Sequence, residues 1–282
     1  MNKIAIIDHP TNDTCGYCYQ CKTLADNLEA DFILPEEMSK SYDYVFLHKT
    51  MGLIHQLLEY KKPITVYMED PTYYINKREV EFINKTNAQV YPLKDLQTDA
   101  FNCGINISNS HIVPPALNFI ERPKKTVEKF TFYWSGHTLA YCHAFMGIME
   151  DLVRVNSDFG PVNVCLMVNN PKKITLVPPI PCTIEHFNIE RVWYRMNQSS
   201  IILSPRFPSY RHSLKFDGRR MWAGWANKPY CDCTNYKELL RLVTDKKHRE
   251  TLGNLNRLHN EKYHDLSTYL PQWRNIITDG EL

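Results

Sequence analysis

A cationic segment in the last third of the chain carries the residues whose types and spacing best suit chemistry. It begins after the apolar run Ile201-Ile202-Leu203 and ends at an expected helix of small residues, 221–226. Between them stand one acid, Asp217, and five cations: Arg206, Arg211, Lys215, Arg219 and Arg220. A strand, a cationic loop and a helix in this order place positive charge at the carboxyl end of a strand and at a helix N-terminus. Folds of the α/β class bind phosphate groups there.

Release of a nucleoside diphosphate is the chemistry that such a segment suits best. Cleavage of a sugar–diphosphate bond builds negative charge on the leaving group, and a site without a metal ion meets that charge with Arg, Lys and helix N-termini. Lys215 and Arg219 are four residues apart, so on a helix they would share a face and could hold one diphosphate. The alternative is a solvated, charge-rich loop that precedes a helix.

Residues 130–233 resemble the donor domain of GT-B glycosyltransferases in their motifs, and the layout of the whole chain resembles theirs. In that family a strand ending in Pro-Ser leads through a charged loop to a small-residue helix, written roughly E-A-x-A-x-G-x-P-V. Here Ser204-Pro205 ends the expected strand, and 223–230 (AGWANKPY) is similar to the helix and the next strand. The resemblance implies a nucleotide-sugar donor bound by Arg206, Lys215, Arg219 and Arg220.

The chain departs from the family pattern at two positions. Trp222 stands where the family's second glutamate contacts the ribose, and Asn227 replaces a glycine. The resemblance therefore carries over no ribose ligand and no stereochemical outcome.

Two further segments are expected to contribute to the donor site. Gly136 and His137 follow an expected strand, where a glycine lets backbone amides approach a phosphate and a histidine could contact a phosphate or a sugar hydroxyl. In the resembled family the segment matching 184–188 holds the nucleobase, so Phe187 could pack on the base. The alternatives are a plain turn at Gly136, a surface role for His137 and a core role for Phe187.

The first half of the chain is expected to bind the acceptor, whose hydroxyl an inverting transferase deprotonates with a carboxylate or a histidine. Candidates at the carboxyl ends of expected strands are Asp8, His48 and the pair Glu69-Asp70. Adjacent carboxylates interact electrostatically, which is one way that enzymes tune groups for proton transfer. We take Asp70 and Asp8 as the catalytic candidates. The alternative for each is a helix N-cap or a turn, which Asp70 before Pro71 suits.

Cys15, Cys18 and Cys21 form a Cys-x2-Cys-x2-Cys run, the most unusual motif of the first half. Three thiolates at this spacing could bind zinc or an iron–sulfur cluster, but no fourth ligand follows at a suitable spacing. We therefore favour a metal-free acceptor loop in which Tyr17 and Tyr19 offer stacking surfaces. The nine cysteines are an odd number and no export signal precedes them, so the thiols are expected to be free.

Glycans, lipid carriers, small molecules, proteins and DNA are all candidate acceptors. In size and layout the chain is similar to compact GT-B transferases that add sugars to hydroxymethylated pyrimidines in phage DNA, and double-stranded DNA is our first hypothesis. A DNA acceptor needs cations and aromatic rings around a flipped base. Residues of these types in the first half are Lys49, Lys61, Lys62, Tyr73, Tyr74, Lys77 and Arg78. The sequence has no amphipathic basic helix for membrane docking and no evident site for a protein partner.

Apolar strand-like segments alternate with helix-like segments in both halves of the chain. This pattern predicts an α/β fold with two doubly wound Rossmann-like domains that face each other across a cleft. Strands are expected at 3–8, 31–34, 44–48, 64–69, 89–92, 130–134, 162–168, 183–187, 200–204 and 229–232. Single helices are expected over 139–155 and 237–258. The domains would be 1–116 for the acceptor, a linker 117–129, 130–264 for the nucleotide-sugar, and a helical tail 265–282 that packs back on the first domain.

Composition limits the remaining function classes. The chain has 282 residues and a net charge of +2, which excludes the overall cationic field of a non-specific DNA coat. No apolar run approaches the roughly 20 residues that span a bilayer, and the N-terminal apolar run is too short for a signal peptide, so we expect a cytoplasmic protein, in the host cytoplasm if it is phage-encoded. No metal or cofactor is expected beyond the nucleotide-sugar co-substrate.

Three alternatives remain open on the sequence alone. They are a glycosyltransferase that acts on a glycan or small molecule, a nucleotide-sugar epimerase of the same fold, and a non-catalytic nucleic-acid-binding protein that uses 206–220. A dehydrogenase is disfavoured because neither half carries Gly-x-Gly-x-x-Gly after its first strand.

Overall fold

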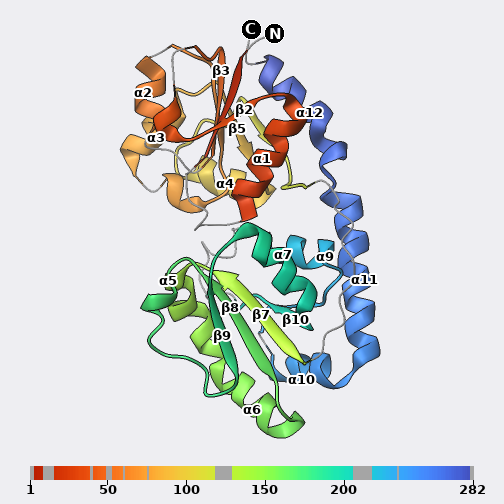
Figure 1. Cartoon of the computed structure of the whole chain (residues 1–282). Coiled ribbons are helices and arrows are strands. Elements are labelled where there is room, and N and C mark those ends of the chain that lie inside the picture. Colours follow the sequence, from red (N-terminus) through yellow and green to blue (C-terminus); the bar gives the residue numbers. More distant parts are fainter. Residues whose placement is uncertain are drawn as a thin grey trace.

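The computed structural model of the chain contains two α/β domains, each built on a parallel sheet with helices on both faces (Figure 1). It describes residues 3–8, 16–38, 41–48, 53–59, 61–74, 76–117, 129–205, 218–233 and 235–279. The predicted fold class, an α/β chain with two doubly wound domains, is confirmed. No helix among these residues is both long enough and apolar enough to cross a membrane.

The first domain contains a six-stranded parallel sheet in the order β2-β1-β3-β4-β5-β6. Its strands are β1 (Ile4–Ile7), β2 (Asp31–Ile33), β3 (Tyr44–His48), β4 (Ile64–Tyr67), β5 (Ala88–Tyr91) and β6 (Ser110–Ile112). The short strand β6 was not expected, because its residues are half-buried and form no apolar run. The register pairs Ile4 with Tyr44 and Val45 with Ile64, so β1, β3 and β4 end at nearly the same level.

The alternation of side chains along each strand assigns the helices of the first domain to two faces. Ala5 and Ile7 pack in one core with residues of α2 (Ile54–Glu59), α3 (Lys77–Ile83) and α4 (Lys94–Asn102). Ile6, which lies between them, packs in the other core with α1 (Gly16–Leu28) and α12 (Leu266–Asp279). Residues two apart along a strand therefore meet the same helix layer.

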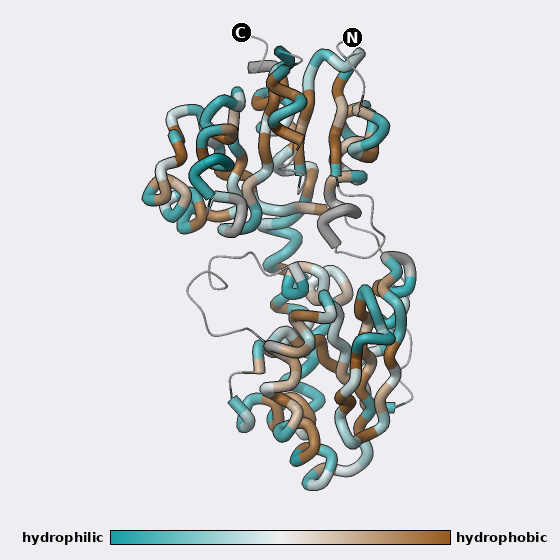
Figure 2. Tube along the Cα trace, turned by 90° about the vertical axis from the view of Figure 1, so that its left-hand side faces the viewer, coloured by the Kyte–Doolittle hydropathy of each residue, from teal (hydrophilic) through white to brown (hydrophobic). Residues whose placement is uncertain are grey.

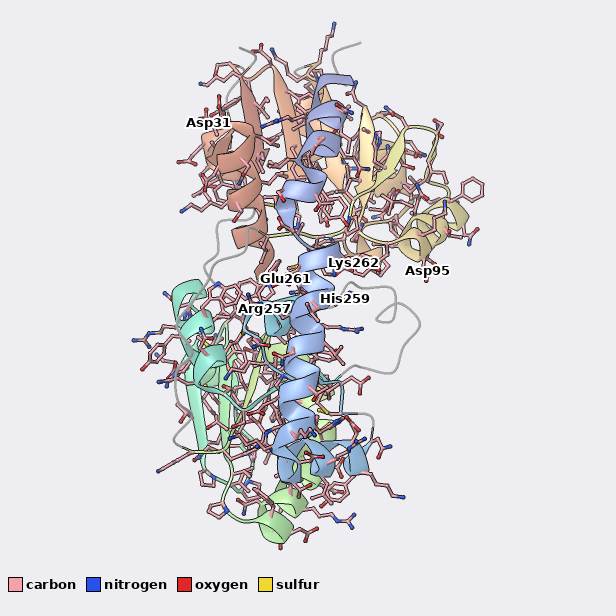
Figure 3. All side chains as sticks on the ribbon, turned by 90° about the vertical axis from the view of Figure 1, so that its right-hand side faces the viewer. Asp31, Asp95, Arg257, His259, Glu261 and Lys262 are labelled. Carbon is pink, nitrogen blue, oxygen red and sulfur yellow. The ribbon has the colours of Figure 1, made fainter. Side chains whose placement is uncertain are left out.

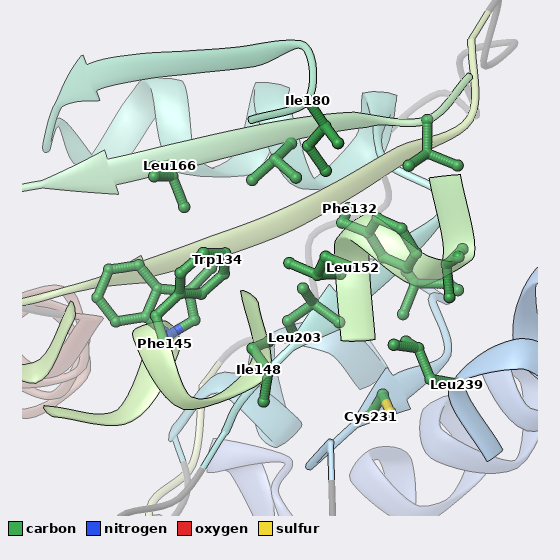
Figure 4. Packing of buried hydrophobic residues seen from close by; sticks show 14 of the residues in the cluster. Phe132, Trp134, Phe145, Ile148, Leu152, Leu166, Ile180, Leu203, Cys231 and Leu239 are labelled. Atoms are coloured by element: carbon green, nitrogen blue, oxygen red, sulfur yellow. The ribbon is translucent and has the colours of Figure 1, made fainter. Parts of the chain in front are cut away.

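The second domain contains a five-stranded parallel sheet in the order β11-β10-β7-β8-β9. Its strands are β7 (Thr131–Gly136), β8 (Asn163–Val168), β9 (Cys182–His186), β10 (Ile201–Leu203) and β11 (Tyr230–Cys231). One face packs against α6 (Met149–Phe159) and α10 (Tyr236–Thr244), and Figure 4 shows Trp134, Phe145 and Leu152 in this core. The other face packs against α7 (Ile189–Gln198) and α9 (Gly218–Trp225).

Two expected helices are each divided in the structure. The segment expected over 139–155 consists of α5 (Thr138–Ala140), a π-helical turn, a short 3-10 turn and α6. The π turn spans Tyr141–Phe145, and the rings of these two residues stack with their centroids 5.2 Å apart. The segment expected over 237–258 is two helices, because Asp245 ends α10 and begins α11 (Lys246–Tyr263) as its N-cap, with its Oδ1 accepting from the His248 amide at 2.9 Å.

The C-terminal helices join the two domains. The helix α11 runs along the second domain, and Figure 3 places Arg257, His259, Glu261 and Lys262 on it near the level where the domains meet. The chain then continues into α12, whose Trp273 packs edge-on against Phe46 of the first sheet with ring centroids 5.2 Å apart. Figure 2 shows the strands of both domains as apolar and the outer helices as largely polar.

The chain crosses between the domains twice, and the two crossings are hydrogen-bonded to each other. The Leu117 amide donates to the His264 carbonyl at 3.0 Å, and the Leu266 amide donates to the Leu117 carbonyl at 3.3 Å. His264 Nδ1 donates to the carbonyl of Pro115 at 2.7 Å. The two crossings therefore form one junction between the domains.

Candidate functional site

The carboxyl edges of the two sheets face each other (Figure 1). The N-terminus lies at the outer end of the first domain, so β1 runs from there toward the second domain. In the second domain α6 runs outward and β8 returns toward the first domain. Parallel α/β sheets bind ligands outside the carboxyl ends of their strands, so a ligand between the domains would contact both edges.

Gly136 ends β7 at this edge, and packing explains why it is a glycine. A Cβ at this position would lie 2.8 Å from Cζ2 of Trp134, a distance that real side chains do not adopt. The Trp134 ring is fully buried and forms part of the core in Figure 4. The close approach of the backbone to Trp134 therefore requires the glycine, whether or not a phosphate binds nearby.

His137 is exposed and is the N-cap of the helix that follows β7. Its Nδ1 accepts from the Leu139 amide at 3.2 Å, and the Thr138 amide donates to Oδ1 of Asn169 at 2.9 Å. Two of the first backbone amides of this helix therefore already have protein partners. A ligand contact at this position would come from the imidazole of His137 rather than from these two amides.

Arg219 lies in the first turn of α9 and reaches back to the end of β7. Its Nη1 donates to the carbonyl of Ser135 at 3.2 Å, and its guanidinium lies 5.8 Å from the centre of the Trp134 ring. The side chain is half-buried, and a Cβ on Gly136 would lie 3.5 Å from Nη1. The structure thus brings Arg219, Gly136 and the end of β7 together, and the role of these residues in donor binding stays a prediction.

Arg220 is exposed on the same helix, and its charge helps to lower the pKa of His259 and His264. It therefore lies toward α11 and the domain junction. Arg206 and Lys215 lie outside the residues that the structure describes, so their predicted contact with a diphosphate stays a prediction.

Phe187 lies in the core between the sheet and the α7 and α9 helices, 7% exposed. This location favours the core alternative, and its predicted contact with a nucleobase stays a prediction.

Sequence reasoning missed a neighbouring ion pair, in which Nε of Arg195 on α7 donates to Oε2 of Glu185 on β9 at 3.1 Å. Trp222, in place of the family's second glutamate, stacks on Trp193 with ring centroids 4.7 Å apart.

Three acidic and basic side chains meet at the carboxyl edge of the first sheet. His48 Nδ1 lies 3.0 Å from Oδ1 of Asp8, and His48 Nε2 lies 3.2 Å from Oε2 of Glu69. The side chains of His48 and Asp8 have no exposed surface, and that of Glu69 is 5% exposed. They lie at or just beyond the ends of β1, β3 and β4, which are neighbours in the sheet, so the strand-end placement predicted from sequence brings them together.

Cys21 of α1 joins this cluster from the helix layer and is 4% exposed. Burial raises the pKa of its thiol to about 11. Burial alone would lower the pKa of His48, but Cys21, Glu69 and Asp8 outweigh it and hold the pKa of the imidazole well above its ordinary value of 6.5.

The other acceptor-side candidates differ in accessibility. Asp70 follows Glu69 and is half-buried at the same edge. Tyr74 is 1% exposed, and its hydroxyl donates to Oδ2 of Asp99 at 2.9 Å, which favours a structural role over acceptor stacking. The side chains of Tyr17, Tyr19 and Tyr73 lie outside the described part of the chain, and their predicted role stays a prediction.

Comparison with known proteins identifies the fold. No protein-family model matches the sequence, and no curated protein matches it by sequence. Among solved structures, Anabaena Alr3699/HepE in complex with UDP and glucose superposes with a TM-score of 0.74 at 10% identity, covering 99% of this chain and 100% of that one. Sucrose-phosphate synthase from Thermosynechococcus elongatus gives a TM-score of 0.72 at 10% identity, covering 99% of each chain. This chain has the GT-B fold.

A third similar structure is an alpha-glucosyltransferase in complex with UDP and a 13-mer DNA that contains an HMU base. It gives a TM-score of 0.66 at 11% identity and covers 98% of this chain and 99% of that one. All three comparisons span both domains, so this chain has the whole GT-B architecture and not a single Rossmann-like half. At these identities the likeness establishes the GT-B fold and leaves the substrates to the site itself.

Proposed function

We propose that this protein is a glycosyltransferase that moves a sugar from a nucleotide-sugar, of the UDP-sugar class, to a hydroxyl acceptor. One observation carries the proposal: Arg219 reaches the carboxyl end of β7 in a chain whose whole length has the GT-B fold. A guanidinium at this edge is suited to a diphosphate, because its planar array of donors matches phosphate oxygens. The other cations of the segment 206–220 would add to the same field.

The proposed reaction breaks the bond between the sugar's anomeric carbon and the diphosphate and forms a bond from that carbon to the acceptor oxygen. The nucleoside diphosphate leaves with the bonding electron pair, and Arg219 meets the charge that develops on it. The acceptor hydroxyl loses its proton to a carboxylate. Asp70 is the best-placed candidate for that base, because it is half-buried, whereas Asp8 is fully buried against His48.

Double-stranded DNA with a hydroxymethylated pyrimidine is the acceptor that we favour. The alpha-glucosyltransferase bound to DNA with an HMU base has the same fold over the whole chain, which supports this choice. Lys77 and Arg78 are exposed at the start of α3, which follows β4 and so begins at the carboxyl edge. Lys61 and Lys62 precede β4, so they lie at the opposite edge and contribute less to such a surface.

The donor is tested first by thermal unfolding with UDP, GDP, CDP, ADP and TDP, with and without a divalent metal. A ligand at a hundred times its Kd stabilises the folded protein by about 2.7 kcal/mol, so binding is readily detected. We expect UDP to give the largest shift. The variant Arg219→Ala should weaken UDP binding by about 1.5–3 kcal/mol, the value of hydrogen bonds to charged groups.

Arg154→Ala is the matched control, because Arg154 also lies over an aromatic ring, 4.2 Å from the centre of Tyr236, on α6 of the same domain. Equal UDP affinity in wild type and Arg219→Ala would refute the donor-site assignment. Transfer is then measured by mass spectrometry of DNA with and without hydroxymethylpyrimidine. Donor binding without modification of that DNA would retain the transferase and reject the DNA acceptor. Salt-sensitive DNA binding with no nucleotide shift would replace both with a nucleic-acid-binding protein.

A further inference from the structure

The buried cluster at the edge of the first sheet contains a set of side chains that the transferase chemistry does not use. Asp8 follows β1, His48 ends β3, and both alternate onto the face covered by α1. Cys21 projects from α1 into the same space. One potential ligand atom from each of the three residues lies within 4.8 Å of the other two, and all three residues are buried.

We infer that Asp8, Cys21 and His48 bind one divalent metal ion of the zinc class. Carboxylate oxygen, thiolate sulfur and imidazole nitrogen are the three protein ligand types of zinc, with bond lengths of about 2.0–2.3 Å. At these lengths two ligand atoms of a tetrahedral site are separated by about 3.3–3.7 Å. The separation of 3.0 Å between Asp8 Oδ1 and His48 Nδ1 needs only a small expansion to admit the ion.

The second nitrogen of His48 supports this assignment. Its Nε2 lies 3.2 Å from Oε2 of Glu69. A histidine that binds a metal through one nitrogen commonly donates the other N–H to a carboxylate, which orients the ring and increases its basicity. Glu69 supplies that carboxylate from β4, so the donor set and its support come from three neighbouring strands and one helix.

The ion would join α1 to the ends of β1 and β3 at the acceptor-side edge, with a water molecule as the fourth ligand that a tetrahedral zinc ion requires. Asp8 and His48 have no exposed side-chain surface, so a ligand between the domains would not reach the ion directly in this conformation. Two arrangements therefore compete for the cluster. One is the metal site, and the other is the metal-free cluster in which His48 contacts Asp8 through Nδ1 and Glu69 through Nε2.

The test uses the full-length protein and two metals. The protein is dialysed against chelating resin, loaded with Zn²⁺ or Co²⁺, dialysed again, and measured by elemental analysis and by absorption. We expect about one equivalent of metal and, for Co²⁺, a thiolate-to-metal charge-transfer band together with tetrahedral d–d bands. This measurement needs no variant. Less than a tenth of an equivalent of either metal in the folded protein would overturn the inference.

Variants then identify the ligands. Cys21→Ser should remove the charge-transfer band, whereas Cys142→Ser, at an exposed cysteine on the second domain, should keep it. Glu69→Gln should keep the band and weaken metal affinity by roughly 10- to 100-fold, the usual effect of losing a supporting carboxylate. If Cys15→Ser or Cys18→Ser removes the metal and Cys21→Ser does not, the ligand set is wrong. UDP-induced stabilisation, measured on each variant, separates this result from the outcome of the proposed function.

Discussion

Replacement of Gly224 by alanine tests how the second domain holds its candidate donor residue. Gly224 lies on α9 where this helix packs against α11. A Cβ there would lie 2.5 Å from Nδ2 of Asn260, 2.6 Å from its Cγ and 2.7 Å from the carbonyl oxygen of Asn256. The Asn260 amide also donates to the carbonyl of Met221, so the two helices are joined at the same point.

The size of the effect follows from which contacts can relax. Asn260 can rotate away, at the loss of its bond to Met221, but the carbonyl of Asn256 belongs to the backbone of α11 and can move only with that helix. Overpacking of this kind costs about 1–3 kcal/mol, and the backbone contact places Gly224→Ala at the upper end, near 3 kcal/mol. At about 2–4 °C per kcal/mol for a protein of this size, the Tm should fall by roughly 6–12 °C.

The displacement should also reach the donor site. Arg219 lies in the first turn of α9, so a shift of α9 away from α11 moves its guanidinium relative to Ser135. We therefore expect weaker UDP stabilisation in Gly224→Ala than in wild type. The double variant Gly224→Ala/Asn260→Ala should recover only part of the stability, because the contact with Asn256 remains.

The assay is urea unfolding followed by circular dichroism, with Gly147→Ala as the matched control. A Cβ at Gly147 would meet nothing within 4 Å, so this variant should be neutral or stabilised by about 0.4–1 kcal/mol through the unfolded state. Gly224→Ala within 0.5 kcal/mol of wild type would contradict the helix packing described above. Equal destabilisation by both variants would contradict the steric explanation.

Three further predictions concern the junction, the second domain and catalysis. Burial lowers the pKa of His264 from 6.5 to about 4, so the unfolded chain binds a proton that the native state rejects, and stability should fall by up to roughly 3 kcal/mol as the pH falls from 6.5 to 4. A pH series of unfolding curves on wild type and His264→Asn should show a shallower dependence in the variant. Glu185→Gln should destabilise the protein by about 1–2 kcal/mol in urea, because it weakens the bonds that Arg195 donates; no change would mean that solvent screens the pair. Asp70→Asn should reduce kcat about 100-fold or more without weakening UDP binding, whereas Asp31→Asn, at the amino edge, should keep full activity. Full activity in Asp70→Asn would exclude Asp70 as the base.

The inner strands β3, β4 and β8 could be predicted because their apolar runs are long enough to indicate burial on both faces of a sheet. β6 could not, since its three residues are half-buried at the sheet edge and resemble a loop. The division of 237–258 depends on one side chain, because Asp245 caps α11 and interrupts a continuous apolar pattern. The helical spacing of apolar residues continues almost unchanged from the first helix into the second, so this spacing alone does not reveal where the first helix ends.

Part of the candidate site could likewise be predicted from the sequence, and part of it could not. The locations of Asp8, His48 and Glu69 follow from sequence, because each comes at or just after a predicted strand and parallel strands end at one edge. The role of Gly136 does not follow, because the need for a glycine comes from the ring of Trp134, two residues earlier, folded against the same backbone. From the sequence motif alone, the glycine is interpreted as a position where the backbone approaches a ligand.

The sequence by itself determined the α/β class, the two-domain layout and the edges at which charged residues gather. These properties depend on local patterns of apolar and charged residues, which can be identified in the sequence without knowledge of the tertiary packing. Only the tertiary structure decided that Cys21 contacts His48 and that Arg219 reaches the end of β7. Each of these contacts depends on how a helix is rotated against a sheet, and that rotation is set by packing of whole layers, such as Gly224 against Asn260.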